Sequence, residues 1–147
     1  MLFAINSYQM KERWLVKRYL AVAGFAFLGG ASREGVELLW PVSDHWLWTT
    51  MLINIIGAFL LTLVNFWAAE RLPLPSEVIL GLGTGFVGAF TTFSSFSLEM
   101  VKLLLRHFIG SAMLYVTLSL VGGLCAAFAG QMLAKWLMAR AQRGGER

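Results

Sequence analysis

Long uncharged stretches dominate the hydrophobic pattern of this chain. Three of them have no charged side chain over 23, 21 and 27 positions: residues 47–69, 78–98 and 108–134. A transmembrane helix needs about 20 mainly apolar residues, so each stretch is long enough to cross a bilayer. A shorter uncharged run, 19–32, can cross the bilayer only as part of a helix over 17–39 in which Arg33 lies at or inside the membrane edge. The pattern therefore predicts four transmembrane helices, over 17–39, 47–69, 77–105 and 108–136.

Composition supports a membrane protein. Hydrophobic residues make up 58% of the chain and charged residues only 14%, which is more apolar than a soluble domain of this length. We expect an all-α integral membrane protein with a single membrane domain over 1–147, placed in the inner (plasma) membrane of the cell. The basic N-terminal flank and the short apolar run after it could alternatively form a signal peptide.

Basic residues are unevenly shared between the two ends of the predicted helices. Nine lie on the side of both termini: Lys11, Arg13, Lys17, Arg18, Arg71, Lys135, Arg140, Arg143 and Arg147. Only Arg33, Lys102 and Arg106 lie on the other side. Taken alone, this count predicts by the positive-inside rule that both termini are cytoplasmic. Because these residues border hydrophobic runs, they favour anionic lipid headgroups over nucleic acid as partners.

The third predicted helix contains an unusually polar segment, GFVGAFTTFSSFSLE over 85–99. Five hydroxyl residues occupy 91–97, directly after Gly85 and Gly88. One or two such residues bond to the preceding turn, but five predict a helix broken near its middle, at 88–92. Carbonyls freed by a break need partners in protein, water or a bound cation. Phe93 and Phe96 share a face, and their positive ring edges could receive a small anion or simply pack against lipid.

Other polar residues in the predicted helices each have two interpretations. Asn54 lies at mid-membrane, where its amide forms an interhelical hydrogen bond or donates to an anion in a pore. Tyr115 and Ser119 align two hydroxyls on one helix face. Arg33 is an anion attractor or an anchor whose charge reaches the headgroups. Glu99 is expected to be a helix-end charge, with an intramembrane acid as the alternative.

Small residues on two helices indicate close packing. Two sets repeat every four residues: Gly81, Gly85 and Ala89, and Gly122, Ala126 and Gly130. The letters G-x-G-x-x-G over 83–88 are not a dinucleotide site, because no strand precedes them. His45 and His107 are isolated and offer no metal cluster. Without a nucleophile–base pair or a metal cluster, we expect that the chain is not an enzyme.

The segment 85–99 is similar to the third-helix signature of the Fluc (CrcB) family of fluoride channels. Weaker support comes from GGASR over 29–33 and NIIG over 54–57, and the resemblance covers all four predicted helices. It implies an antiparallel, dual-topology dimer that passively exports fluoride for fluoride resistance. It also implies a fluoride pathway along Asn54, Phe93, Ser94, Ser95, Phe96, Tyr115 and Ser119, with Arg33 near a vestibule. The backbone carbonyls of Gly88 and Thr91 would hold a structural sodium ion at the dimer axis.

The chain departs from the family pattern at two positions. Ala89 stands where a second glycine is frequent, and Gly123 stands where a serine track would continue. The charge bias between the two sides is larger than a dual-topology homodimer should show, so a heterodimer with a homologous chain is the alternative. Two other functions are the alternatives. A small multidrug-type, proton-coupled efflux transporter would need an acid in the middle of its first helix, where this chain has none. A non-transporting membrane scaffold would account for the repeats of small residues but not for the hydroxyl and phenylalanine residues over 90–97.

Overall fold

The computed structural model describes residues 2–40 and 48–144, and in this part the chain is helical without strands. Position 47, the predicted start of the second transmembrane helix, lies outside the described residues. In chain order the elements are α1 Leu2–Leu39, α2 Trp48–Leu63, η1 Val64–Ala68, α3 Ala69–Arg71, α4 Ser76–Leu80, η2 Gly81–Val87, α5 Gly88–Phe90, α6 Phe93–Leu105 and α7 Ile109–Gly144, where η1 and η2 are π-helical.

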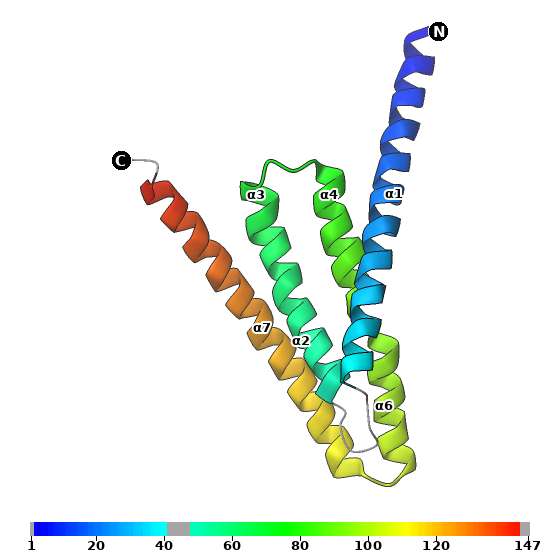
Figure 1. Cartoon of the computed structure of the whole chain (residues 1–147), viewed down its shortest axis with the longest axis vertical. Coiled ribbons are helices and arrows are strands. Elements are labelled where there is room, and N and C mark those ends of the chain that lie inside the picture. The colour runs from blue at the N-terminus through cyan, green and yellow to red at the C-terminus, as the bar shows by residue number, and fades with distance from the viewer. Residues whose placement is uncertain (1, 41–47, 145–147) are drawn as a thin grey trace.

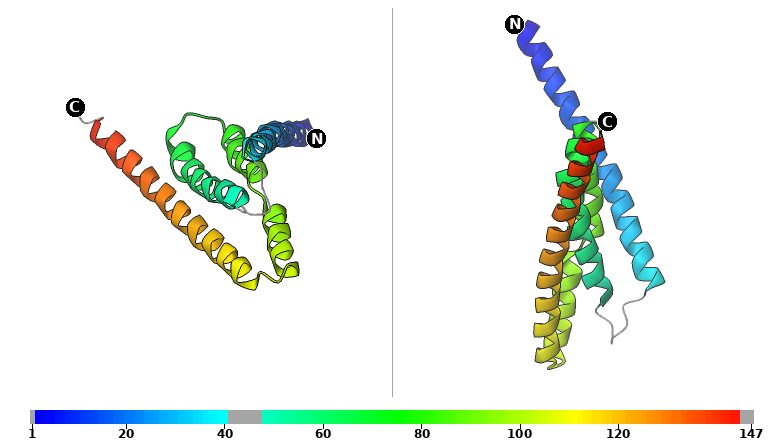
Figure 2. Two further views of the ribbon diagram at one scale, coloured as in Figure 1. Left: turned by 60° about the horizontal axis from the view of Figure 1, so that its bottom comes forward. Right: turned by 90° about the vertical axis from the view of Figure 1, so that its left-hand side faces the viewer.

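The elements form a bundle of long, roughly aligned helices (Figures 1 and 2). Both ends of the chain lie at one end of the bundle, together with the α3–α4 connection, and the α6–α7 connection lies at the other. Helix α2 packs mainly against α7, and α1 packs mainly against η2 and α5. The run from α4 to α6 therefore lies beside α1 along its first half and reaches α7 in its second half.

Three helical stretches are long and apolar enough to cross a membrane: Trp48–Arg71, Ser76–Leu105 and Ile109–Gln142. They confirm the expectation of an all-helical protein with several membrane-capable helices. The predicted first crossing, 17–39, lies within α1 and is not among the three. Its uncharged centre, 19–32, is shorter than a bilayer crossing. A fourth crossing stays a prediction.

Glycines set the distance between neighbouring helices. A side chain at Gly85 would meet the Val22 carbonyl oxygen of α1 at 2.6 Å, and one at Gly130 would meet the Phe59 carbonyl oxygen of α2 at 2.8 Å. Backbone atoms cannot move aside as a flexible side chain can, so these positions accept only glycine without a shift of the helices. The prediction that the two sets of small residues serve close packing is confirmed at Gly85 and Gly130.

Adjacent glycines on α1 allow a matched test of this packing. A Cβ atom on Gly29 would overlap the Phe86 carbonyl group of η2, whereas one on Gly30 would have nothing within 4 Å. We expect Gly29→Ala to lower the free energy of unfolding by about 1–3 kcal/mol, as overpacking does. Gly30→Ala should leave it unchanged or raise it by up to about 1 kcal/mol, because alanine favours the helix. Thermal unfolding in detergent compares the two, and equal stabilities would contradict the close α1–η2 contact.

Candidate functional site

The helical backbone is interrupted at two residues between α5 and α6. Thr91 (φ −79°, ψ 156°) and Thr92 (φ −146°, ψ 122°) are both extended. Thr92 is the N-cap of α6, and its hydroxyl oxygen accepts a hydrogen bond from the Ser95 backbone N–H at 3.2 Å. Threonine is a favoured N-cap because its oxygen satisfies an N–H that has no partner within the helix. A hydroxyl residue at this position therefore stabilises the new start of the helix.

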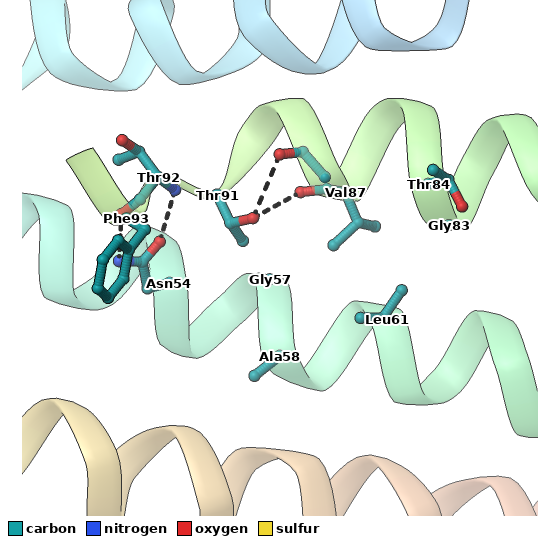
Figure 3. Close-up of a pocket in the computed structure, with 11 residues that line it drawn as sticks. Asn54, Gly57, Ala58, Leu61, Gly83, Thr84, Val87, Thr91, Thr92 and Phe93 are labelled. Atoms are coloured by element: carbon teal, nitrogen blue, oxygen red, sulfur yellow. Dashed lines mark hydrogen bonds between the residues drawn. The ribbon is translucent and has the colours of Figure 1, made fainter. Parts of the chain in front are cut away.

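Asn54 of α2 binds the extended backbone from the side. Its amide Nδ2 donates to the Thr92 carbonyl oxygen at 2.9 Å, and its Oδ1 accepts from the Thr92 N–H at 2.9 Å (Figure 3). One amide thus satisfies both backbone groups of the extended residue, which would be costly to leave unpaired inside a membrane. Of the two interpretations of Asn54, the interhelical hydrogen bond is the one that the structure contains. Its role as a donor to an anion stays a prediction.

This pairing predicts a structural effect of removing the amide. Asn54→Ala deletes two hydrogen bonds and leaves the Thr92 N–H and carbonyl unpaired, so we expect the free energy of unfolding to fall by about 2–4 kcal/mol. The matched control is Asn65→Ala, because Asn65 is an exposed asparagine of η1. Unfolding in detergent is the measurement. An Asn54→Ala protein as stable as the control would show that the amide does not hold this backbone segment.

Two carbonyl groups lose their helical donors at the interruption. In a continuous helix the Thr92 N–H would bond to the Gly88 carbonyl and the Ser95 N–H to the Thr91 carbonyl. Instead the first bonds to Asn54 and the second to the Thr92 hydroxyl. Among the described residues, the Thr91 hydroxyl is the one donor recorded for the Gly88 oxygen, at a long 3.5 Å. Both carbonyls are therefore available to a partner from outside this segment.

Aromatic rings continue from the interruption toward α7. The ring centroids of Phe93 and Phe96 are 5.9 Å apart, and those of Phe96 and Tyr115 are 5.2 Å apart. The prediction that Phe93 and Phe96 share a helix face is confirmed by this distance. Phe93 is the first residue of α6, within the stretch Ser76–Leu105, and it is 80% exposed in the single chain. The rings form a row, here called the aromatic row, that starts at the surface and ends at a buried tyrosine.

Glu99 ends the aromatic row as a buried acid, and this corrects the prediction that it is a helix-end charge. It lies in the middle of α6 and is 6% exposed. Its two carboxyl oxygens accept hydrogen bonds from the Thr50 and Tyr115 hydroxyls, each at 2.6 Å. Such short bonds are typical of hydroxyl groups donating to a carboxylate. Three helices, α2, α6 and α7, are joined at this point.

Thr50 was not predicted as a site residue, although the sequence contains a signal for it. It precedes Asn54 by four positions, so the two side chains lie on one face of α2. One of them binds Thr92 and the other binds Glu99. The polar face of α2 thus holds the stretch Ser76–Leu105 at two points, one at the interruption itself and one in the middle of α6.

The remaining predicted site residues lie in three places. Ser94 and Ser95 surround the Thr92 hydroxyl, with oxygen–oxygen distances of 3.2 and 3.1 Å. Ser119 lies one turn beyond Tyr115 on α7, and its hydroxyl oxygen is buried without a hydrogen-bond partner among the described residues. Arg33, on α1, forms an ion pair with Glu37 at 3.7 Å. No described contact joins Arg33 to the aromatic row, and its vestibule role stays a prediction.

A hollow of about 470 Å³ runs along the interruption on the outside of the single chain. It is lined by α2 and by the run from η2 to α6, and Figure 3 shows Asn54 and Phe93 at one end and Leu61 and Thr84 at the other. The Gly88 and Thr91 positions lie along it. The described residues contain no group of three or more His, Cys, Asp or Glu side chains that could hold a metal. A cation here would therefore depend on backbone carbonyls.

Comparison with known proteins gives the family. The model of the family described as "CrcB-like protein, Camphor Resistance (CrcB)" matches residues 20–131. A Bacillus cereus protein named fluoride-specific ion channel FluC 1 is 40% identical over 124 residues, which are 82% of this chain and 89% of the relative. A Lactiplantibacillus plantarum protein named fluoride-specific ion channel FluC 2 is 41% identical over 125 residues, 83% of this chain and 96% of the relative. The chain is a multi-pass membrane protein that belongs to the CrcB family.

Proposed function

We propose that this chain is a fluoride-selective channel, which lets fluoride leave the cell down its electrochemical gradient and so confers fluoride resistance. Its relatives in three genera are named fluoride-specific ion channels, at about 40% identity over most of both chains. Membership of this family also confirms the expectation that the chain is not an enzyme. The proposed location is the inner (plasma) membrane. Taken alone, the positive-inside rule would put both termini in the cytoplasm, but in an antiparallel homodimer one of the two copies has the reverse orientation.

The observation that carries this proposal is the aromatic row with hydroxyl groups beside it. Ring edges have partial positive charge, and hydroxyls donate hydrogen bonds, so both can replace part of the water shell of a small anion. The buried Ser119 hydroxyl has no hydrogen-bond partner in the described part of the chain, so it can donate to an anion. Many weak donors suit conduction, because a single strong cation would hold the ion too tightly to release it.

A sodium ion bound to the Gly88 and Thr91 carbonyls is the second part of the proposal. Their helical donors are used elsewhere, and oxygen ligands suit a hard monovalent cation. Two carbonyls from one chain are too few to replace a hydration shell, so a second chain would supply the others. The ion would fix the geometry of the interruption and would not move with fluoride.

We propose further that the chain crosses the membrane four times, with its third crossing interrupted at Thr91 and Thr92, and forms an antiparallel homodimer. The hollow beside Gly88 and the exposed Phe93 are the surfaces that a second copy would cover. A Cβ atom on Gly88 would meet the Gly83 carbonyl oxygen only at 4.0 Å, so the described residues leave space beside this position. A heterodimer with a homologous chain is the alternative, since the basic residues divide nine to three between the two sides.

Liposomes test the passive mechanism. Proteoliposomes loaded with potassium fluoride should release fluoride when valinomycin lets potassium follow, because a channel moves net charge and a voltage otherwise stops it. Release should be slow without valinomycin and should not depend on a pH gradient. Release that a proton gradient drives against the fluoride gradient would replace the channel with a coupled transporter, such as the multidrug-type alternative.

A further inference from the structure

A second hollow, of about 480 Å³, lies near the end of the bundle that holds both termini. Its lining residues come from α1, the α2–η1 segment, α4 and η2, and they include Arg18, Leu61, Asn65, Ser76, Gly83 and Thr84. Four lining residues have polar side chains: Arg18, which is a cation, and Asn65, Ser76 and Thr84, which are neutral. None of them takes part in the aromatic row or in the predicted fluoride pathway, so the hollow has no role in the function proposed above.

The two hollows are neighbours along the chain surface. Leu61, Gly83 and Thr84 line both of them. Figure 3 shows these three residues at the end of the first hollow that lies away from Phe93. An ion in the second hollow would therefore lie directly beside the surface that leads to Thr91, Asn54 and the aromatic row.

Arg18 has unused hydrogen-bonding capacity. Its guanidinium lies over the Trp14 ring at 4.0 Å, a contact that positions the group and leaves its N–H donors free. The Arg18 Nε is buried and has no hydrogen-bond partner among the described residues. No carboxylate of the described residues lies within ion-pair distance of it, unlike Arg33, which pairs with Glu37. A half-buried guanidinium with free donors is suited to an anion.

The polar neighbours of Arg18 fit a small anion. Asn65 and Thr84 are exposed and can donate through an amide and a hydroxyl. The Ser76 hydroxyl donates to the Glu77 carboxylate at a long 3.4 Å, so it can turn toward a better acceptor. The Glu77 charge is adjacent and weakens anion binding, which favours a loosely held ion over a tightly held one.

We propose that Arg18, with Asn65, Ser76 and Thr84, forms a weak binding site for a small anion in the second hollow, beside the end of the first hollow that lies away from Phe93. This inference rests on the proposed function, in which the anion is fluoride. The site raises the local fluoride concentration next to the first hollow and leaves the rate of passage along the aromatic row unchanged. Charged residues in a recess act in this way on ions of opposite sign.

The test is fluoride efflux from liposomes of neutral lipid, with fluoride concentration and ionic strength varied. At low fluoride and low salt, Arg18→Gln should reduce efflux about three- to tenfold, and saturating fluoride or added impermeant salt should remove the difference. Arg18→Lys should retain most of the efflux. Thr84→Val should also reduce efflux, but by a smaller factor than Arg18→Gln. Lys17→Gln is the matched control, because it removes the same charge from an exposed neighbour on α1.

Four results would overturn the inference. One is an equal loss in Lys17→Gln, which would mean that general surface charge is responsible. Another is Arg18→Gln efflux equal to wild type at every fluoride concentration. A loss confined to liposomes with anionic lipid would assign Arg18 to a lipid phosphate instead. The fourth is a wild-type chain that carries no fluoride, in which case the proposed function fails and this inference fails with it. If the wild type carries fluoride and the Arg18→Gln variant carries it equally well, only this inference is rejected.

Discussion

Replacing both Phe93 and Phe96 with isoleucine should lower fluoride efflux from proteoliposomes about a hundredfold. The two rings lie 5.9 Å apart at the surface end of the aromatic row. Isoleucine keeps the side chain apolar but removes the ring edge with its partial positive charge. If each edge stabilises the passing anion by about 1.4 kcal/mol, each substitution costs a factor of about ten. The single substitutions should therefore fall between the double variant and the wild type.

The control for this prediction has to keep the membrane and the fold constant. Phe128→Ile removes an exposed phenylalanine from α7, where the side chain is 65% exposed and makes none of the ring contacts of the aromatic row. It should conduct as the wild type does. All variants should also elute from a sizing column as the wild type does. Undiminished efflux in a correctly assembled double variant would remove the rings from the pathway.

Glu99→Ala should lower the free energy of unfolding by about 2–6 kcal/mol, the largest stability effect that we expect. The carboxylate accepts from Thr50 and Tyr115 in a buried position, at 2.6 Å each. Alanine would leave two buried hydroxyls without an acceptor, and each unpaired group costs about 1–3 kcal/mol. The same change also separates α2, α6 and α7 at the point where this acid connects them.

Glu99→Gln separates hydrogen bonding from charge. Glutamine has the same shape and keeps one acceptor oxygen, so it should recover more than half of the stability that alanine loses. The exposed Glu34 of α1 is the matched control, and Glu34→Ala should have no measurable effect. Chemical or thermal unfolding in detergent gives the comparison. If Glu99→Ala were as stable as Glu34→Ala, the acid would not connect the three helices.

Local patterns in the sequence predicted those features that depend on helical spacing. The shared face of Phe93 and Phe96 follows from a separation of one helical turn, and the close contacts of Gly85 and Gly130 follow from repeats of small residues. The polarity of the third helix was also readable, because five hydroxyl residues in a short segment do not suit a lipid-facing surface.

Partners far apart in the sequence could not be predicted in the same way. Glu99 is followed by Lys102 and Arg106, a pattern typical of a helix end, and its burial depends on Thr50, which is 49 positions away. Likewise, the predicted position of Asn54 in the middle of the membrane indicates that its amide needs a hydrogen-bond partner. That this partner is Thr92 follows only from the packing of α2 against the interruption. Which residue satisfies a buried polar group is decided by tertiary structure, which helical periodicity does not encode.

This chain alone should form a pathway for fluoride. The most direct measurement is fluoride efflux, recorded with a fluoride electrode, from valinomycin-treated liposomes that contain only this purified chain. We predict rapid release of fluoride and no release of chloride above the level of protein-free liposomes. Absence of fluoride release from well-folded protein would contradict the homodimeric fluoride channel, and equal release of chloride would contradict its selectivity.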